Sequence, residues 1–165
     1  MREKIAVGIL GATGVVGQNY LRLLVDHPWF EIVDLAASSR SAGKTYADAV
    51  GERWLMESDM PEAFMNQPVR DVRDYAAIPE DVKLFFSATE LEDKQATRDF
   101  EFAYAEQGYA VVSNSSANRW TSDAPMIIPE INGDHLKILK SQQKNRNLPG
   151  SGFVAVKPNC SVQSY

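Results

Sequence analysis

Short apolar runs alternate along the chain with stretches that have the apolar spacing of a helix. Strands are predicted over residues 4–10, 31–37, 82–88, 109–113 and 153–156, because each run is brief and most border glycine, proline or polar residues. Helices are predicted over residues 15–25, 92–107 and 134–141. This alternation predicts an α/β fold of Rossmann type, with a mostly parallel sheet and helices on both faces.

Other stretches have weaker patterns. Residues 38–74 mix serine, glycine, proline and charge, which favours an irregular loop with short strands near Trp54 and Val69. Residues 126–131 are expected to be extended and split by Pro129, and residues 145–152 to form a loop. The aromatic residues Trp29 and Phe85 are expected in the core.

Composition excludes several classes of protein. The 165 residues carry 17 Lys and Arg against 22 Asp and Glu, a net charge of −5, so binding to nucleic acid is not expected. No apolar run reaches the roughly 20 residues that a membrane span needs. One cysteine, Cys160, rules out an internal disulfide framework. A cytoplasmic protein without a metal site is expected.

A glycine-rich turn follows the first predicted strand and precedes the first predicted helix. Gly11, Gly14 and Gly17 stand at every third position. Gly11 suits a tight turn, Gly14 allows a pyrophosphate close to the backbone, and Gly17 allows close packing of helix and strand. The context favours a dinucleotide site at the helix N-terminus. A tight turn without a ligand is the alternative.

The end of the second predicted strand bears on the choice of cofactor. NAD-binding proteins place an acidic residue there for the ribose 2′-hydroxyl, and Asp34 comes too early in the strand for that role. The chain instead offers hydroxyls and a guanidinium, which suit a 2′-phosphate. NADP is therefore favoured over NAD, and a solvated loop is the alternative. The residues concerned are Ser38, Ser39, Arg40 and Ser41.

Cys160 lies near the end of the chain, after Asn159 and close to Lys157. If a helix begins there, its dipole and the lysine both favour the thiolate. A thiolate attacks carbonyl carbon and holds an acyl group as a thioester. The alternative is an inert buried cysteine.

Four segments together resemble the aspartate-semialdehyde dehydrogenases of the archaeal and fungal branch, over nearly the whole chain. They are residues 11–17, 38–44, 113–119 and 158–161, in that order. The resemblance implies an NADP-dependent enzyme that reduces L-aspartyl 4-phosphate to aspartate semialdehyde and phosphate. It also implies a homodimer or homotetramer at full length.

The resemblance also implies roles for particular residues. Cys160 would be the nucleophile, and Asn159 would orient or polarise the acyl group. Asn114 and Arg119 would bind the acyl phosphate or free phosphate. Residues implied to hold the cofactor are Gly11, Thr13, Gly14, Val15 and Val16 at the pyrophosphate, Ser38, Ser39, Arg40 and Ser41 at the 2′-phosphate, and Ser87 and Ala88 near the nicotinamide.

We expect residues 1–157 to form the NADP-binding domain and residues 158–165 to begin a catalytic domain. The family's histidine base lies in a C-terminal α+β domain that also carries dimer contacts, and neither His27 nor His135 matches it. The chain alone is therefore expected to bind NADP with little or no turnover. Reduction of N-acetylglutamyl phosphate or malonyl-CoA, and a non-catalytic NADP-binding module, remain alternatives.

Overall fold

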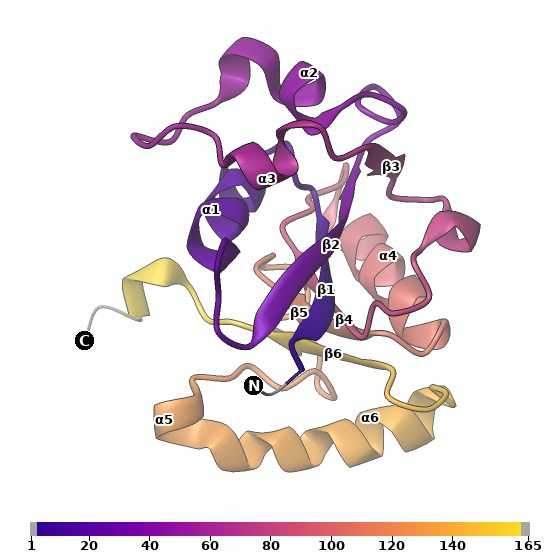
Figure 1. Ribbon diagram of the computed structural model, residues 1–165. Helices are drawn as coiled ribbons and strands as arrows, with labels where there is room; N and C mark the ends of the chain where they lie inside the picture. Colours follow the sequence, from indigo (N-terminus) through magenta and orange to yellow (C-terminus); the bar gives the residue numbers. More distant parts are fainter. Residues whose placement is uncertain (1–2, 163–165) are drawn as a thin grey trace. The chain divides into compact units, whose positions relative to one another are not determined.

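The computed structural model describes residues 3–162, and the chain forms two compact units, residues Met1–Ala88 and Thr89–Tyr165. In the first unit, four parallel strands lie in the order β3-β2-β1-β4 (Figure 1). Their bounds are β1 Ile5–Leu10, β2 Phe30–Ala37, β3 Val69–Asp71 and β4 Leu84–Ser87. Helix α1, Val15–Leu24, connects β1 to β2. The predicted parallel sheet and its first strand–helix–strand unit are confirmed.

The core of the first unit lies where α1 packs on β1 and β2. Val7, Ile9, Leu21 and Leu35 are fully buried there. In β1, Gly8 leaves room for an aromatic ring, because a Cβ at this position would lie 2.2 Å from Cε1 of Phe85 on β4. The absence of a side chain at Gly8 therefore lets the buried ring of Phe85 pack over the neighbouring strand.

The segment between β2 and β3 is more regular than its sequence predicts. It contains two short helices, α2 Tyr46–Val50 and α3 Glu62–Met65, and a 3-10 turn η1, Gly51–Arg53. The strand near Val69 is confirmed as β3. The strand near Trp54 is wrong, since this residue lies outside any strand, and its indole N–H donates to the carbonyl of Ser58.

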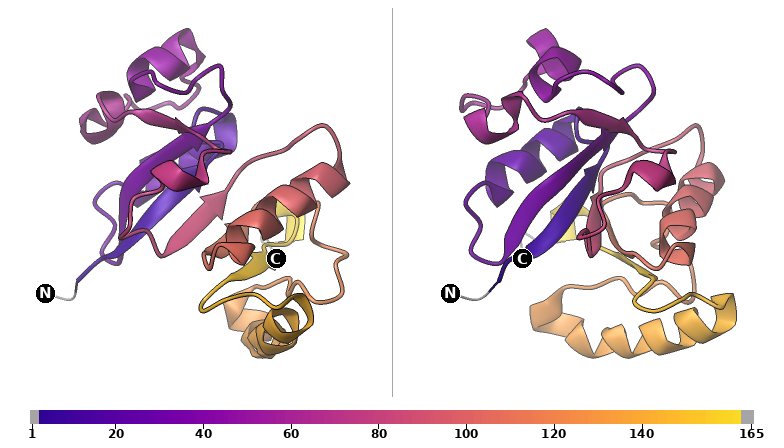
Figure 2. Two further views of the ribbon diagram at one scale, coloured as in Figure 1. Left: turned by 90° about the vertical axis from the view of Figure 1, so that its right-hand side faces the viewer. Right: turned by 45° about the vertical axis from the view of Figure 1, so that its right-hand side comes forward.

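The second unit contains a parallel pair of strands, β5 Ala110–Ser113 and β6 Phe153–Val156. Helix α4, Lys94–Glu106, packs against both strands, and helix α6, Ile138–Arg146, packs against β6 (Figure 2). Asp93 caps α4 through the N–H of Ala96, and Gly108 follows the helix with a φ of 93°.

The outer edge of β6 is closed by hydrogen bonds from α6 and from residues 125–127. The buried amide of Gln142 accepts from the N–H of Val154 and donates to its carbonyl, at 2.8 and 2.9 Å. The N–H of Val156 donates to Pro125, and its carbonyl accepts from Ile127. This edge of the strand is therefore not open to pairing with another strand.

Two further expectations are wrong. Residues 129–132 form a short helix, α5 Pro129–Asn132, because proline at the first helical position fits the helical φ and needs no N–H partner. Trp29 is 67% exposed instead of lying in the core, whereas Phe85 is fully buried. No helix within residues 3–162 is long and apolar enough to cross a membrane.

Candidate functional site: a dinucleotide turn and a cysteine turn

The glycine turn lies between β1 and α1, as predicted. Gly11 has a φ of 80°, a conformation that residues with a Cβ rarely adopt. At Gly17 a Cβ would lie 2.2 Å from the carbonyl oxygen of Gly11, so only glycine lets the helix come this close. At Gly14 the nearest atom would be 3.5 Å from a Cβ, and this residue is exposed. The turn therefore presents bare backbone outward at Gly14.

The N-terminus of α1 suits an anion. Its N-cap is Gly14, which supplies no side-chain cap, and the first turn has no acidic residue. Val15 and Val16 are 50% and 38% exposed. The backbone N–H groups at the start of a ten-residue helix attract phosphate, so these residues fit the pyrophosphate of a dinucleotide.

The loop after β2 leaves the sheet beside the glycine turn. The N–H groups of Gly11 and Ala12 both donate to the carbonyl of Ala36, near the end of β2, at 2.9 and 3.0 Å. The loop is a tight turn in which the N–H of Ser41 donates to the carbonyl of Ser38. Of the predicted 2′-phosphate residues, Ser38, Ser39 and Arg40 are exposed and Ser41 is 5% exposed.

Asp34 has a structural partner. Its buried carboxylate pairs with Arg70 of β3 at 2.6 Å. The guanidinium also donates to the backbone carbonyls of Asp71 and Asp74. This pairing occupies the carboxylate, which agrees with its exclusion as a ribose ligand.

The predicted nicotinamide-side residues lie at the end of β4. Ser87 is fully buried at the last position of the strand. The N–H of Ala88 donates to the carbonyl of Leu10 at 2.8 Å, so this residue extends the pairing of β4 with β1 up to the glycine turn. Both residues therefore lie at the carboxyl edge of the sheet, where open α/β sheets bind ligands.

Cys160 is exposed in the turn after β6. Three donors meet the side-chain oxygen of Asn159: the thiol of Cys160 at 3.3 Å, and the N–H and hydroxyl of Ser161 at 3.1 and 3.2 Å. These three contacts fix the orientation of the Asn159 amide through its oxygen. Its NH2 group makes none of them, and within residues 3–162 it has no acceptor. Cys160 is therefore not buried, which contradicts the alternative of a buried cysteine.

The helix predicted after the cysteine is a 3-10 turn, η4 Cys160–Val162, in the described part of the chain. Residues 163–165 lie outside the described range.

Arg119 connects the loop after β5 to the loop after β6. Its Nε donates to the carbonyl of Lys157 at 3.2 Å, and its Nη2 donates to that of Asn114 at 3.4 Å. The two predicted phosphate residues are therefore in contact. They lie within the same unit as Cys160, which follows Lys157 by three positions.

Buried Glu101 of α4 fixes the loop that carries these residues. Its two carboxylate oxygens accept from the hydroxyl of Ser113 and the amide of Asn118, at 2.6 and 2.7 Å. The hydroxyls of Ser113 and Ser115 in turn accept from backbone N–H groups two residues on. In this segment, Ser113, Ser115 and Asn118 thus have structural roles, whereas Asn114 and Arg119 are the predicted ligands.

Both histidines have local partners. Nδ1 of His27 accepts from the N–H groups of Trp29 and Phe30, and Nδ1 of His135 lies 3.1 Å from the amide of Asn132. No group of three or more potential metal ligands occurs in residues 3–162.

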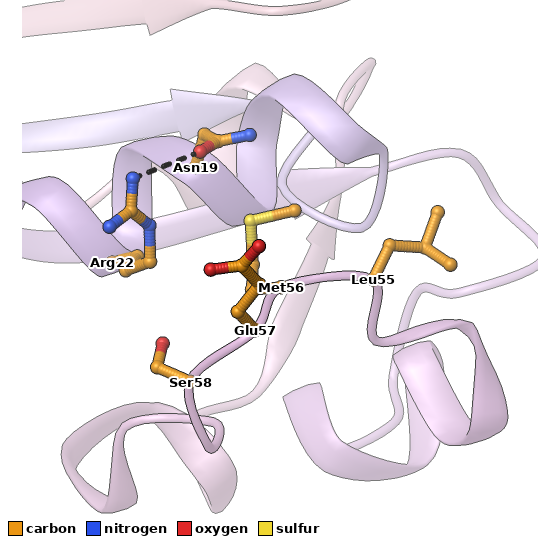
Figure 3. Close-up of a pocket in the computed structure, with 6 residues that line it drawn as sticks. All are labelled: Asn19, Arg22, Leu55, Met56, Glu57 and Ser58. Atoms are coloured by element: carbon orange, nitrogen blue, oxygen red, sulfur yellow. Dashed lines mark hydrogen bonds between the residues drawn. The ribbon is translucent and has the colours of Figure 1, made fainter.

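A cavity of about 330 Å³ lies beside α1 (Figure 3). Its lining is mixed, with Arg22 donating to Asn19 at 3.4 Å across one wall. The other lining residues are Leu55, Met56, Glu57 and Ser58. None of the predicted site residues contributes to it.

Two residues near the glycine turn were missed by sequence reasoning. The buried hydroxyl of Tyr46 donates to the carbonyl of Ala12, and the buried amide of Gln18 donates to that of Thr13. Tyr46 lies in the stretch without a clear pattern. For Gln18 the only signal in the sequence was a polar residue directly after Gly17, in the part of the helix that packs close to the strand.

The comparisons with known proteins agree with this geometry. The chain is 37% identical over 164 residues to the aspartate-semialdehyde dehydrogenase of Archaeoglobus fulgidus, covering 96% of this chain and 43% of that protein. It is 36% identical over 163 residues to the malonyl CoA reductase (NADP) of Metallosphaera sedula, covering 99% and 43%. The chain thus spans less than half the length of these curated relatives.

Solved structures confirm the fold. The chain matches the structure of aspartate semialdehyde dehydrogenase with NADP from Candida albicans with a TM-score of 0.79 and 35% identity, covering 96% of this chain and 44% of that one. Residues 6–139 match the model of the semialdehyde dehydrogenase family, NAD binding domain. The chain therefore belongs to the semialdehyde dehydrogenase family and contains its dinucleotide-binding domain.

Proposed function

We propose that this chain is the NADP-binding portion of an enzyme that converts L-aspartyl 4-phosphate to L-aspartate 4-semialdehyde and phosphate, and catalyses the reverse reaction. Such a reaction serves the biosynthesis of lysine, threonine and methionine. The observation that carries the proposal is the presence of two separate features in one chain. These are a glycine turn with exposed backbone at Gly14 and an exposed cysteine whose thiol donates to Asn159.

The preference for NADP is supported by the residues after β2. Asp34 is occupied by Arg70, and the exposed side chains at the end of the strand are hydroxyls and a guanidinium. A guanidinium donates charge-assisted hydrogen bonds to a phosphate dianion. The relative from Candida albicans was solved with NADP, which agrees with this preference.

In the proposed reaction, the sulfur of Cys160 attacks the acyl carbon of the substrate. A carbon–sulfur bond forms, the bond from carbon to the phosphoryl oxygen breaks, and phosphate leaves with the electron pair. The reduced cofactor, when bound, would supply a hydride to the thioester carbon. The carbon–sulfur bond then breaks, and the sulfur of Cys160 leaves with the electron pair as the aldehyde forms. The amide NH2 of Asn159 is suited to donate to the acyl oxygen, where negative charge develops.

Arg119 and Asn114 are proposed to bind the phosphate group. Two of the five N–H groups of the arginine donate to backbone carbonyls, which fixes the plane of the guanidinium and leaves other N–H groups for a ligand. A fixed guanidinium offers paired donors with the spacing of phosphate oxygens. The histidine base and the groups that bind the substrate's amine and carboxylate are proposed to come from outside these 165 residues.

A second candidate is reduction of malonyl-CoA, which the 36% identity to the Metallosphaera sedula reductase favours. The chemistry at sulfur would be the same, with a thiolate of coenzyme A leaving in place of phosphate. The two reactions differ in their need for the residues proposed to bind phosphate.

The test is turnover by the protein at its full natural length. Phosphate-dependent reduction of NADP is measured with aspartate semialdehyde and with N-acetylglutamate semialdehyde, and oxidation of NADPH is measured with malonyl-CoA. Turnover with aspartate semialdehyde that needs phosphate supports the proposal. Efficient turnover of malonyl-CoA with none of aspartate semialdehyde would replace it with the second candidate.

A further inference from the structure

Most backbone groups of the glycine turn form hydrogen bonds with other backbone groups. The N–H groups of Gly11 and Ala12 donate to Ala36, and the N–H of Gly14 donates to the carbonyl of Gly11. The carbonyl of Gly14 accepts from the N–H of Gln18 in α1. These bonds are internal to the backbone, and they leave two carbonyls of the turn to be satisfied by other means.

Two side chains satisfy those carbonyls. The Tyr46 hydroxyl lies 3.0 Å from the carbonyl oxygen of Ala12, and the amide nitrogen of Gln18 lies 3.1 Å from that of Thr13. The same amide of Gln18 also donates to Arg53 and accepts from the N–H of Leu55, which holds its orientation. Tyr46 is fully buried, and its position is set by its place at the start of α2.

The direction of one carbonyl sets the direction of one N–H. In a trans peptide the C=O and the following N–H point to opposite sides, so a bond that holds the carbonyl of Ala12 directs the N–H of Thr13 the other way. Within residues 3–162, the N–H groups of Thr13, Val15 and Val16 have no acceptor. They are the donors that the turn can offer to a ligand.

We infer that Tyr46 is a positioning residue of the dinucleotide site, which holds the Ala12–Thr13 peptide so that the N–H of Thr13 faces the pyrophosphate. It acts through the backbone and does not touch the ligand. Burial raises the pKa of its hydroxyl, so Tyr46 stays protonated and remains a donor at neutral pH. The inference rests on the proposed NADP site and adds a residue to it.

The test compares two ligands in the Tyr46→Phe variant, which removes one oxygen and keeps the ring. NADP contains the pyrophosphate, whereas adenosine 2′-monophosphate contains the ribose 2′-phosphate and no pyrophosphate. We expect the dissociation constant for NADP to rise about three- to tenfold, as for the loss of one hydrogen bond, and that for adenosine 2′-monophosphate to stay unchanged. A structural defect alone would weaken both ligands.

A control variant and a further measurement make the result decisive. Tyr104→Phe removes a hydroxyl from an equally buried tyrosine of the second unit, and it is expected to leave both constants unchanged. In the wild-type protein, the amide resonance of Thr13 is expected to shift on addition of NADP and to stay unchanged with adenosine 2′-monophosphate, a measurement that needs no variant and so keeps the mechanism testable if Tyr46→Phe does not fold. Unchanged binding of NADP in Tyr46→Phe, or equal weakening of both ligands, would overturn the positioning role. A wild-type protein that binds neither ligand would instead contradict the proposed function.

Discussion

Arg70 meets the carboxylate of Asp34 with two nitrogens, Nε at 3.1 Å from one oxygen and Nη2 at 2.6 Å from the other. Both side chains are almost completely buried. The pair joins β2 to β3 next to the loop proposed to hold the 2′-phosphate, and it occupies the buried acidic residue of β2.

Asp34→Asn is expected to destabilise the protein by about 3–5 kcal/mol, because it leaves a buried guanidinium without its counter-charge. The matched control is Asp123→Asn. Asp123 pairs with Arg146, a more exposed arginine, and its loss is expected to cost about 0–1 kcal/mol. Urea unfolding of both variants measures the difference, and equal losses would show that burial does not govern the two pairs.

Arg40→Ala is expected to raise the dissociation constant for NADP by about tenfold or more, the loss of a charge-assisted hydrogen bond, and to change that for NAD little. The control is Lys44→Ala, which removes another exposed cation from the same segment. Calorimetry with both cofactors gives the ratio of affinities. If NADP and NAD weaken equally, Arg40 does not bind the 2′-phosphate.

Two glycines of the turn are expected to respond differently to a methyl group. Gly17→Ala places a Cβ against the backbone of Gly11 and Ala12, so it is expected to destabilise the fold and lower the melting temperature. Gly14→Ala meets no atom closer than 3.5 Å and has a φ of −80°, so the fold is expected to persist. Gly14→Ala is nevertheless expected to lose affinity for NADP, because its Cβ would lie where the pyrophosphate is proposed to approach. Retention of full affinity would remove Gly14 from the site.

Tyr46 is expected to make stability fall in alkaline solution. Its pKa is raised in the folded state above the ordinary value of about 10, so the unfolded state loses its proton first and the folded state loses stability above that pH. Tyr46→Phe lacks this dependence. The stability difference between wild type and Tyr46→Phe should therefore shrink as the pH rises from 9 to 11. A difference that stays constant over this range would mean that the hydroxyl titrates normally.

The sequence predicted the elements whose residues follow a regular apolar pattern. Helices α1 and α4 each have a buried face with the helical period, and the strand before the glycine turn is a short apolar run whose last four residues are all buried. The glycine turn was also recognisable, because its three glycines stand between a strand and a helix. The preference for NADP was predicted from a different feature, the hydroxyls and the guanidinium that follow the second strand.

Short elements were missed because they depend on contacts that periodicity does not encode. Helix α2 has five residues and is capped by Thr45, whose hydroxyl accepts from the N–H of Asp48. Trp54 was assigned to a strand from its apolar character, but its N–H meets a carbonyl in a turn. Likewise, Tyr46 and Gln18 act through hydrogen bonds to backbone carbonyls. Tyr46 donates to Ala12, which is distant in the sequence, and Gln18 donates to Thr13 in the preceding turn.

The most direct test of the proposed chemistry is to trap the acyl group on sulfur. The protein at its full natural length is mixed with aspartate semialdehyde and NADP without phosphate, quenched in acid, digested and analysed by mass spectrometry. An aspartyl adduct on the peptide that contains Cys160, absent in Cys160→Ser and lost on addition of phosphate, is the expected result. Full turnover by Cys160→Ala, with no adduct on the wild-type peptide, would contradict the thioester mechanism.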